Sequence, residues 1–148
     1  MEERQGTTAI SFFEGEYRFL SNFYPAKVKY EGITYLNSEA AFQASKTLNP
    51  IERLSLADKN PSEAKRIGRR ILLRKDWEEV KFSIMKDIVK AKFEQNPTLK
   101  EKLIATGDAY LEEGNTWGDR IWGVCNGTGA NNLGIILMEV REELKNAI

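Results

Sequence analysis

Histidine is absent from the 148-residue chain. Its absence excludes every Ser-His-Asp or Cys-His catalytic arrangement and every metal site that depends on imidazole ligands. Only one cysteine, Cys125, is present, so the chain can form neither an intrachain disulfide nor a thiolate-rich zinc or iron–sulfur site. We therefore expect no metal and no cofactor. An acid, base or nucleophile must come from Asp, Glu, Lys or Tyr.

A net charge and a long hydrophobic run are also missing. Lys and Arg total 22, Asp and Glu total 22, and the formal charge is zero, so no global basic field holds nucleic acid nonspecifically. No run approaches the roughly 18 apolar residues of a membrane span, and the N-terminus lacks the pattern of a signal peptide. These absences, with the single cysteine, predict a cytoplasmic protein without a membrane partner.

The composition is that of an ordinary globular domain. Hydrophobic residues make up 41% of the chain and charged residues 30%, and the length fits a single domain over residues 1–148. Residues 28–30 and 33–35 flank Glu31-Gly32 and predict a hairpin. We expect an α+β fold, mostly helical, with a small antiparallel sheet.

Capping signals and apolar periodicity predict the helices. Ser38 is the expected N-cap of a helix over 39–48, which Asn49-Pro50 stops. Two capping boxes, which begin at Asn60 and Asp76, predict two more helix starts. The last predicted helix has one apolar face: Leu133, Ile136, Leu137, Val140 and Leu144.

Glu39, Gln43 and Lys46 stand at i, i+4 and i+7 of the first predicted helix, so their side chains share one face. A carboxylate beside an amine suits cleavage of a glycosidic bond, which passes through an oxocarbenium-like state. A lysine whose pKa is lowered by burial or by a cation could also attack an anomeric carbon and hold the opened sugar as a Schiff base. The alternative is a solvated helix face with an ordinary Glu–Lys pair.

A loop rich in glycine and asparagine runs from Gly114 to Asn132, ahead of the last predicted helix. Glycines such as Gly118 let a ligand approach the backbone, and Trp117 offers a flat surface to a base or sugar. Asp119 could act as acid, base or hydroxyl anchor. A surface loop with a helix cap explains the same pattern.

A basic run extends from Lys65 to Lys75: Lys65, Arg66, Arg69, Arg70, Arg74 and Lys75. Arginine favours bidentate phosphate contacts, and Arg69 is our candidate for orienting a phosphate, although a solvated helix face is the alternative. The aromatic segment 19–25 contains Asn22, which either caps a turn or binds a ligand edge.

Motifs over roughly residues 10–145 resemble the YbiA-like or NADAR family. They are Phe19 to Pro25, Ser38-Glu39 with Gln43 and Lys46, Gly68-Arg69, Arg74 to Trp77, Ala91-Lys92-Phe93, Trp117-Gly118-Asp119, and Asn131 through Arg141. The resemblance implies an N-glycosidase that acts on a ribosyl–nitrogen bond. Its members are linked to ribosylamino intermediates of the riboflavin pathway and to removal of ADP-ribose from guanine.

Site residues also follow from this resemblance. It implies that Glu39, Lys46 and Asp119 are the reactive groups. The residues that it implies for the pocket are Asn22, Phe23, Trp117, Asn131 and Gly134. We also expect Gln43 and Gly118 to contact the substrate. The chain departs from many relatives at Thr128 and Ala130, where they carry lysines that could contact a phosphate.

The expected substrate is a phosphorylated ribosylamine or an ADP-ribosylated base, and nucleic acid is expected only as a modified substrate. The alternative is a non-catalytic module that binds nucleotides derived from NAD or ADP-ribose. A nucleic-acid binder that uses the basic run fits poorly with a net charge of zero.

Overall fold

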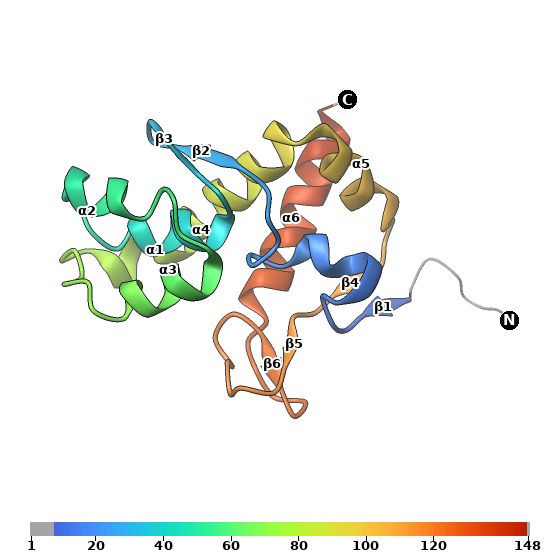
Figure 1. The fold of residues 1–148 in the computed structure, drawn as a ribbon. Coiled ribbons are helices and arrows are strands. Elements are labelled where there is room, and N and C mark those ends of the chain that lie inside the picture. Colours follow the sequence, from blue (N-terminus) through green and yellow to red (C-terminus); the bar gives the residue numbers. More distant parts are fainter. Residues whose placement is uncertain (1–7, 148) are drawn as a thin grey trace, which may run out of the picture. The chain divides into compact units, whose positions relative to one another are not determined.

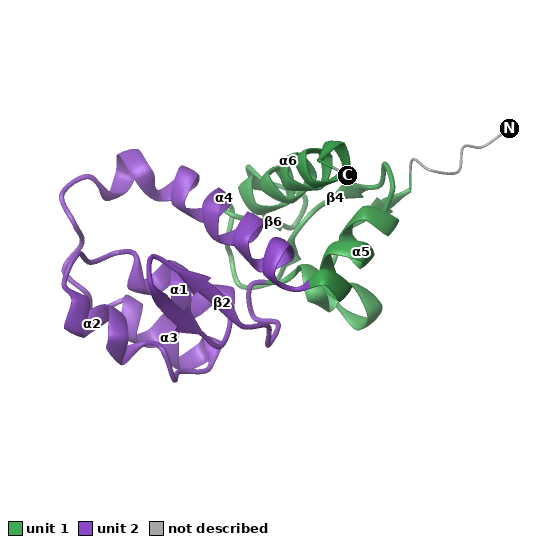
Figure 2. Cartoon of the chain, turned by 90° about the horizontal axis from the view of Figure 1, so that it is seen from above, with its two compact units in different colours: residues 1–21, 97–148 green, residues 22–96 purple. Residues whose placement is uncertain are grey.

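The computed structural model describes residues 8–147 and divides the chain into two compact units (Figure 2). Unit 1 comprises residues 1–21 and 97–148, and unit 2 comprises residues 22–96. Short two-stranded sheets accompany the helices, which confirms the α+β, mostly helical expectation. The single domain stays a prediction. No helix among the described residues is long and apolar enough to cross a membrane.

Unit 2 consists of a hairpin and four helices (Figure 1). They are β2 (Val28–Tyr30), β3 (Ile33–Tyr35), α1 (Ser38–Ala44), α2 (Pro50–Ser55), α3 (Pro61–Gly68) and α4 (Trp77–Gln95). The antiparallel hairpin has the predicted register, with Tyr30 opposite Ile33, and its turn residues Glu31 and Gly32 both have positive φ. Helix α1 packs against α3 and α4, and β2 packs against α4.

Unit 1 is built around the C-terminal helix. Its elements are β1 (Ala9–Ile10), the 3-10 helix η2 (Gly15–Leu20), α5 (Pro97–Ala105), β4 (Tyr110–Leu111), β5 (Gly114–Asn115), β6 (Val124–Cys125) and α6 (Asn132–Asn146). The predicted apolar face of α6 is buried, and α6 packs against α5 and β4. The pairs β1–β4 and β5–β6 are parallel, which the sequence did not predict.

The helix caps agree only in part with the sequence prediction. The N-cap of α1 is Asn37 instead of Ser38, because the Asn37 Oδ1 accepts a hydrogen bond from the Ala40 N–H at 2.7 Å. The helix also ends at Ala44, four residues before the predicted end. The capping box at Asn60 is confirmed. The predicted helix start at Asp76 is confirmed, because α4 begins at Trp77. The predicted capping box there is wrong, because the Asp76 side chain makes no capping hydrogen bond.

Candidate active site

Helix α1 holds two buried polar side chains, and a lysine follows its C-terminal end. Glu39 is 8% exposed and Gln43 is 5% exposed, and the Gln43 Nε2 donates to the Glu39 Oε2 at 2.6 Å. Lys46 follows the helix end in a continuing turn, with its N–H donating to the Gln43 carbonyl at 3.2 Å. The three residues predicted to share a face therefore lie together in unit 2. A hydrogen bond to the carboxylate fixes its orientation beside Lys46.

The Gln43 side chain occupies space that a glycine of the neighbouring helix leaves open. A Cβ added at Gly68 of α3 would lie 1.8 Å from the Gln43 Oε1 and 2.6 Å from its Cδ. No side chain fits at this position unless Gln43 moves. Gln43, which the sequence placed among the substrate contacts, is thus a buried support for Glu39.

The environment of Lys46 lowers the pKa of its amine. Burial is the largest cause, since it disfavours the charged ammonium, and the nearby cations Arg69 and Lys65 lower the pKa further. The carboxylate of Glu39 acts in the opposite direction and raises the pKa, but the net shift is downward. Lys46 therefore has more neutral, nucleophilic amine at a given pH than an exposed lysine.

Asn22 and Phe23 reach the same region from the segment before the hairpin. The Asn22 carbonyl accepts from the Glu39 N–H at 3.1 Å, and its side-chain Oδ1 accepts from the Ser38 Oγ at 3.0 Å. Asn22 is 7% exposed, so its contacts fix the start of α1. Phe23 is 41% exposed, and the Lys65 Nζ lies 5.8 Å from the centre of its ring.

Lys65 is the residue of this region that the sequence did not single out. It lies one helical turn before Arg69, the C-cap residue of α3, so Lys65 and Arg69 can face the same ligand. The sequence contained this i, i+4 spacing, but nothing local distinguished Lys65 from the other cations of the basic run. An exposed aromatic ring, two cations and a half-buried amine suit a ligand with a flat group and a phosphate.

In unit 1, the predicted residues Trp117, Gly118 and Asp119 lie on the loop between β5 and β6. Trp117 is 64% exposed. The Asp119 Oδ1 accepts from the backbone N–H groups of Ile121 and Trp122, at 3.1 and 2.9 Å. Asp119 therefore shapes its own loop in addition to any role toward a ligand.

Asn131 and Gly134 support the start of α6. The buried Asn131 donates from its Nδ2 to the Leu111 carbonyl at 2.9 Å and accepts from the Glu113 N–H at 2.9 Å. A Cβ at Gly134 would lie 2.1 Å from the Leu111 carbonyl oxygen, so glycine permits the close approach of α6 to β4. Both residues shape unit 1 by these contacts.

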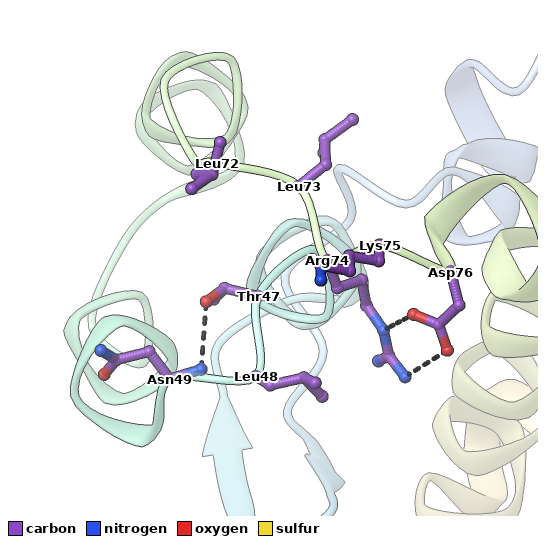
Figure 3. A pocket seen from close by; sticks show the side chains of 8 residues that line it. All are labelled: Thr47, Leu48, Asn49, Leu72, Leu73, Arg74, Lys75 and Asp76. Carbon is purple, nitrogen blue, oxygen red and sulfur yellow. Dashed lines mark hydrogen bonds and ion pairs between the residues drawn. The ribbon is translucent and has the colours of Figure 1, made fainter.

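The predicted site residues thus divide between the two units. Unit 2 brings together Asn22, Phe23, Glu39, Gln43, Lys46 and Arg69. The residues that belong to unit 1 are Trp117, Gly118, Asp119, Asn131 and Gly134. A shared site stays a prediction. A surface hollow of about 550 Å³ on unit 2 is lined by other residues, at 47–49 and 72–76 (Figure 3).

Comparison with known proteins gives consistent matches. The NADAR domain profile matches residues 11–145 and so extends over both units. The N-glycosidase YbiA of Shigella flexneri is 42% identical over 147 residues, with 93% of this chain and 89% of the relative covered. A riboflavin biosynthesis protein of Vibrio vulnificus is 37% identical over 142 residues, which are 92% of this chain and 38% of that protein.

The fold matches as well as the sequence does. The NMR structure of the Escherichia coli protein YbiA superimposes with a TM-score of 0.85 at 39% identity, covering 95% of this chain and 86% of that one. Similarity at this level to curated N-glycosidases, over most of both chains, makes the protein an enzyme that hydrolyses N-glycosyl compounds. The chain belongs to the NADAR domain family.

Proposed function

We propose that the enzyme hydrolyses a ribosyl–nitrogen bond in a phosphorylated ribosylamine or an ADP-ribosyl substrate such as ADP-ribosyl-guanine, with lysine and carboxylate chemistry. The observation that carries the proposal is the lowered pKa of Lys46 beside Glu39. A small-molecule nucleotide or an ADP-ribosylated base is the partner that we propose. Nucleic acid enters only as a modified substrate.

The reaction that we propose begins with attack of the neutral Lys46 amine on the anomeric carbon. The carbon–nitrogen bond to the base breaks, and the departing nitrogen takes a proton from the carboxylic acid of Glu39 or Asp119. The carboxylate takes a proton from the ammonium formed at Nζ and passes it to the ring oxygen, so that the ring opens and the sugar is held as a Schiff base on Nζ. Water then adds to the imine, the sugar leaves as the ribose phosphate or as ADP-ribose according to the substrate, and the neutral amine is regenerated.

In this proposal the phosphate is bound by Lys65 of α3 and by Arg69, the C-cap residue of that helix. Lys65 and Arg69 are the cations that act on the pKa of Lys46, so a phosphate bound between them would lie near the attacking amine. Such binding energy, remote from the breaking bond, can orient the sugar for attack. Phe23 offers its exposed ring to the base. The residues of unit 1 that we propose as substrate contacts are Trp117 and Gly118 of the β5–β6 loop, and Asn131 and Gly134 at the start of α6.

The names of two relatives support different parts of the proposal. The name N-glycosidase given to the Shigella relative supports the bond that is cleaved. The Vibrio relative is named a riboflavin biosynthesis protein, which supports the phosphorylated ribosylamine as one substrate class.

A panel of substrates tests the proposal directly. The protein is incubated with ADP-ribosyl-guanosine, free ADP-ribose and ribosylamino-pyrimidine phosphates, and the release of free base is followed by chromatography. Release of base from a member of the panel is the expected result. Binding without release would instead favour the nucleotide-binding module, and release from none would refute the substrate class.

Variants test the roles of individual residues. Lys46→Ala should abolish turnover and remain folded, whereas Lys81→Ala, which removes a lysine of α4 paired with Glu78, should behave like the wild type. Borohydride added during turnover should attach the sugar to Lys46, as mass spectrometry can show. Near-normal turnover by Lys46→Ala would rule out the covalent role.

Asp119 requires a matched pair of variants, because its carboxylate also holds the loop. Asp119→Asn keeps a carbonyl oxygen for the two backbone N–H groups but removes the acid, whereas Asp119→Ala removes both. Loss of turnover in Asp119→Asn with a normal melting temperature would support an acid–base role. Normal turnover in that variant would leave Glu39 as the only proposed carboxylate.

A further inference from the structure

The backbone on either side of Lys46 is held from outside its own helix. Lys46 follows the C-cap residue Ser45, and carbonyl groups at a helix end have no partner within the helix. The Lys46 carbonyl accepts from the backbone N–H of Arg74 at 2.8 Å. The Ser45 carbonyl accepts from the Arg74 Nη1 at 3.4 Å. One residue of the α3–α4 connection therefore binds two consecutive carbonyls at the nucleophile.

The guanidinium of Arg74 is itself fixed by Asp76. Its Nε donates to the Asp76 Oδ1 at 2.7 Å and its Nη2 donates to the Asp76 Oδ2 at 3.2 Å (Figure 3). The hydrogen bonds from Arg74 lower the pKa of the Asp76 carboxyl, so the pair stays ionised. Asp76 occupies the N-cap position of α4 but makes no capping bond. Its carboxylate accepts hydrogen bonds from the Arg74 guanidinium instead.

The same short segment is also anchored to α1 by an aromatic contact. The ring of Trp77 lies 5.1 Å from the ring of Phe42, measured between centroids. Arg74 and Asp76 line one side of the hollow of about 550 Å³, and residues 47–49 line the other (Figure 3). The hollow borders Thr47, the residue after Lys46, so this segment has room to shift when the side-chain bond from Arg74 to the Ser45 carbonyl is lost.

We propose that Arg74, held by Asp76, is a positioning residue that fixes the backbone of Lys46 and thereby the direction in which its amine points. The inference rests on the proposed role of Lys46 as nucleophile. Arg74 is a support because its hydrogen bonds reach main-chain carbonyls and Asp76. A displacement of about 1 Å at a reacting group can cost on the order of 100-fold in rate, so support of this kind affects catalysis more than binding.

Four variants test the proposal by steady-state kinetics. Arg74→Ala removes the guanidinium bond to the Ser45 carbonyl and keeps the backbone bond to the Lys46 carbonyl. It should lower kcat by about 10-fold with little change in KM, because orientation is loosened and the phosphate contacts remain. Asp76→Asn, which loosens the guanidinium, should show the same pattern to a smaller degree. Arg74→Lys keeps the charge without the fork geometry and should not restore kcat. Lys81→Ala breaks the ion pair with Glu78 within α4 and is the matched control.

A second measurement reports on Lys46 without any turnover. Acetic anhydride labels neutral amines, and peptide mass spectrometry follows the labelling of Lys46 as a function of pH. When the segment shifts outward, the amine becomes more hydrated, so its labelling midpoint should move to higher pH in Arg74→Ala and Asp76→Asn. The midpoints of the other lysines should not move.

The two measurements separate this inference from the proposed function. If the wild type releases no base from any substrate, the proposed function fails, but the labelling midpoints still test the positioning. Unchanged kcat and an unchanged Lys46 midpoint in Asp76→Asn and Arg74→Lys, as in Lys81→Ala, would overturn the inference. Those two variants also decide the matter if Arg74→Ala does not fold.

Discussion

Substitution of Gly68 by alanine should damage the active site through Gln43. The new methyl carbon would lie 1.8 Å from the Gln43 Oε1, whereas real contacts of this kind are at least 3.0 Å. The amide must therefore move by about 1.2 Å (the difference between the two distances), which is comparable to the displacement that impairs catalysis. Because Gln43 is 5% exposed and bonded to Glu39 at 2.6 Å, it cannot move without disturbing that bond.

The magnitude follows from two opposing effects. Loss of a hydrogen bond to a charged group costs about 1.5 to 3 kcal/mol, whereas glycine to alanine within a helix stabilises by about 1 kcal/mol. Gly68→Ala should therefore lower the free energy of unfolding by about 0.5 to 2 kcal/mol. It should also lower kcat by about 10-fold, because the Glu39 carboxylate loses its fixed orientation. Urea unfolding and steady-state kinetics measure the two quantities.

A double-mutant cycle isolates the cause. In a Gln43→Ala background the contacts with Oε1 and Cδ are absent and only a contact of 3.1 Å with the Cβ of residue 43 remains, so adding Gly68→Ala should cost far less stability than in the wild type. Kinetics in this background should show no further loss of kcat. An equal cost of Gly68→Ala in both backgrounds would refute the reasoning, because it would show that Gly68 and Gln43 act independently.

Three further predictions concern charges and a cap. Lys65→Met removes a cation that lowers the pKa of Lys46, so the midpoint of the pH profile of kcat should move upward, and an unmoved midpoint would contradict the electrostatic coupling. Lys92 is buried and its pKa is lowered to about 7, from 10.5 in an exposed lysine. Between these two pKa values the unfolded chain binds more protons than the folded one, so the free energy of unfolding should rise with pH across that window. Urea unfolding should detect this rise in the wild type and not in Lys92→Met. Asn37→Ala should cost about 1 kcal/mol of stability, because Asn37 caps α1 at the Ala40 N–H, and a normal melting curve would contradict that contribution.

Local patterns predicted the parts of the fold that depend on neighbouring residues. The structure confirms the Glu31-Gly32 turn and the predicted register of the two strands, because a two-residue turn fixes the pairing of the residues beside it. The parallel pairing of β1 with β4 joins Ala9 to Tyr110 and could not be predicted, because it depends on contacts between distant segments. Burial of Lys92 was also missed, since a lysine on an amphipathic helix normally lies in water.

The site shows the same division between local and long-range information. Helical spacing predicted that Glu39, Gln43 and Lys46 share a face, and these residues do lie together. The basic run, in contrast, looked uniform in sequence. The fold separates its members, because Lys65 faces Phe23 and acts on Lys46, whereas Arg74 binds Asp76. Which cation meets which partner depends on how α3 and the start of α4 pack against α1.

The cations proposed to bind phosphate are also those that lower the pKa of Lys46, so the two functions must be coupled. A phosphate bound to Lys65 and Arg69 would cancel much of their positive field, and the pKa of Lys46 would then rise toward its ordinary value. The pH profile of kcat reports the substrate complex, and the profile of kcat/KM reports the free enzyme. The alkaline shift should therefore appear as a higher midpoint for kcat than for kcat/KM. Equal midpoints would show that these cations do not bind the phosphate, and a midpoint for kcat below that for kcat/KM would show that burial by the substrate outweighs the phosphate charge.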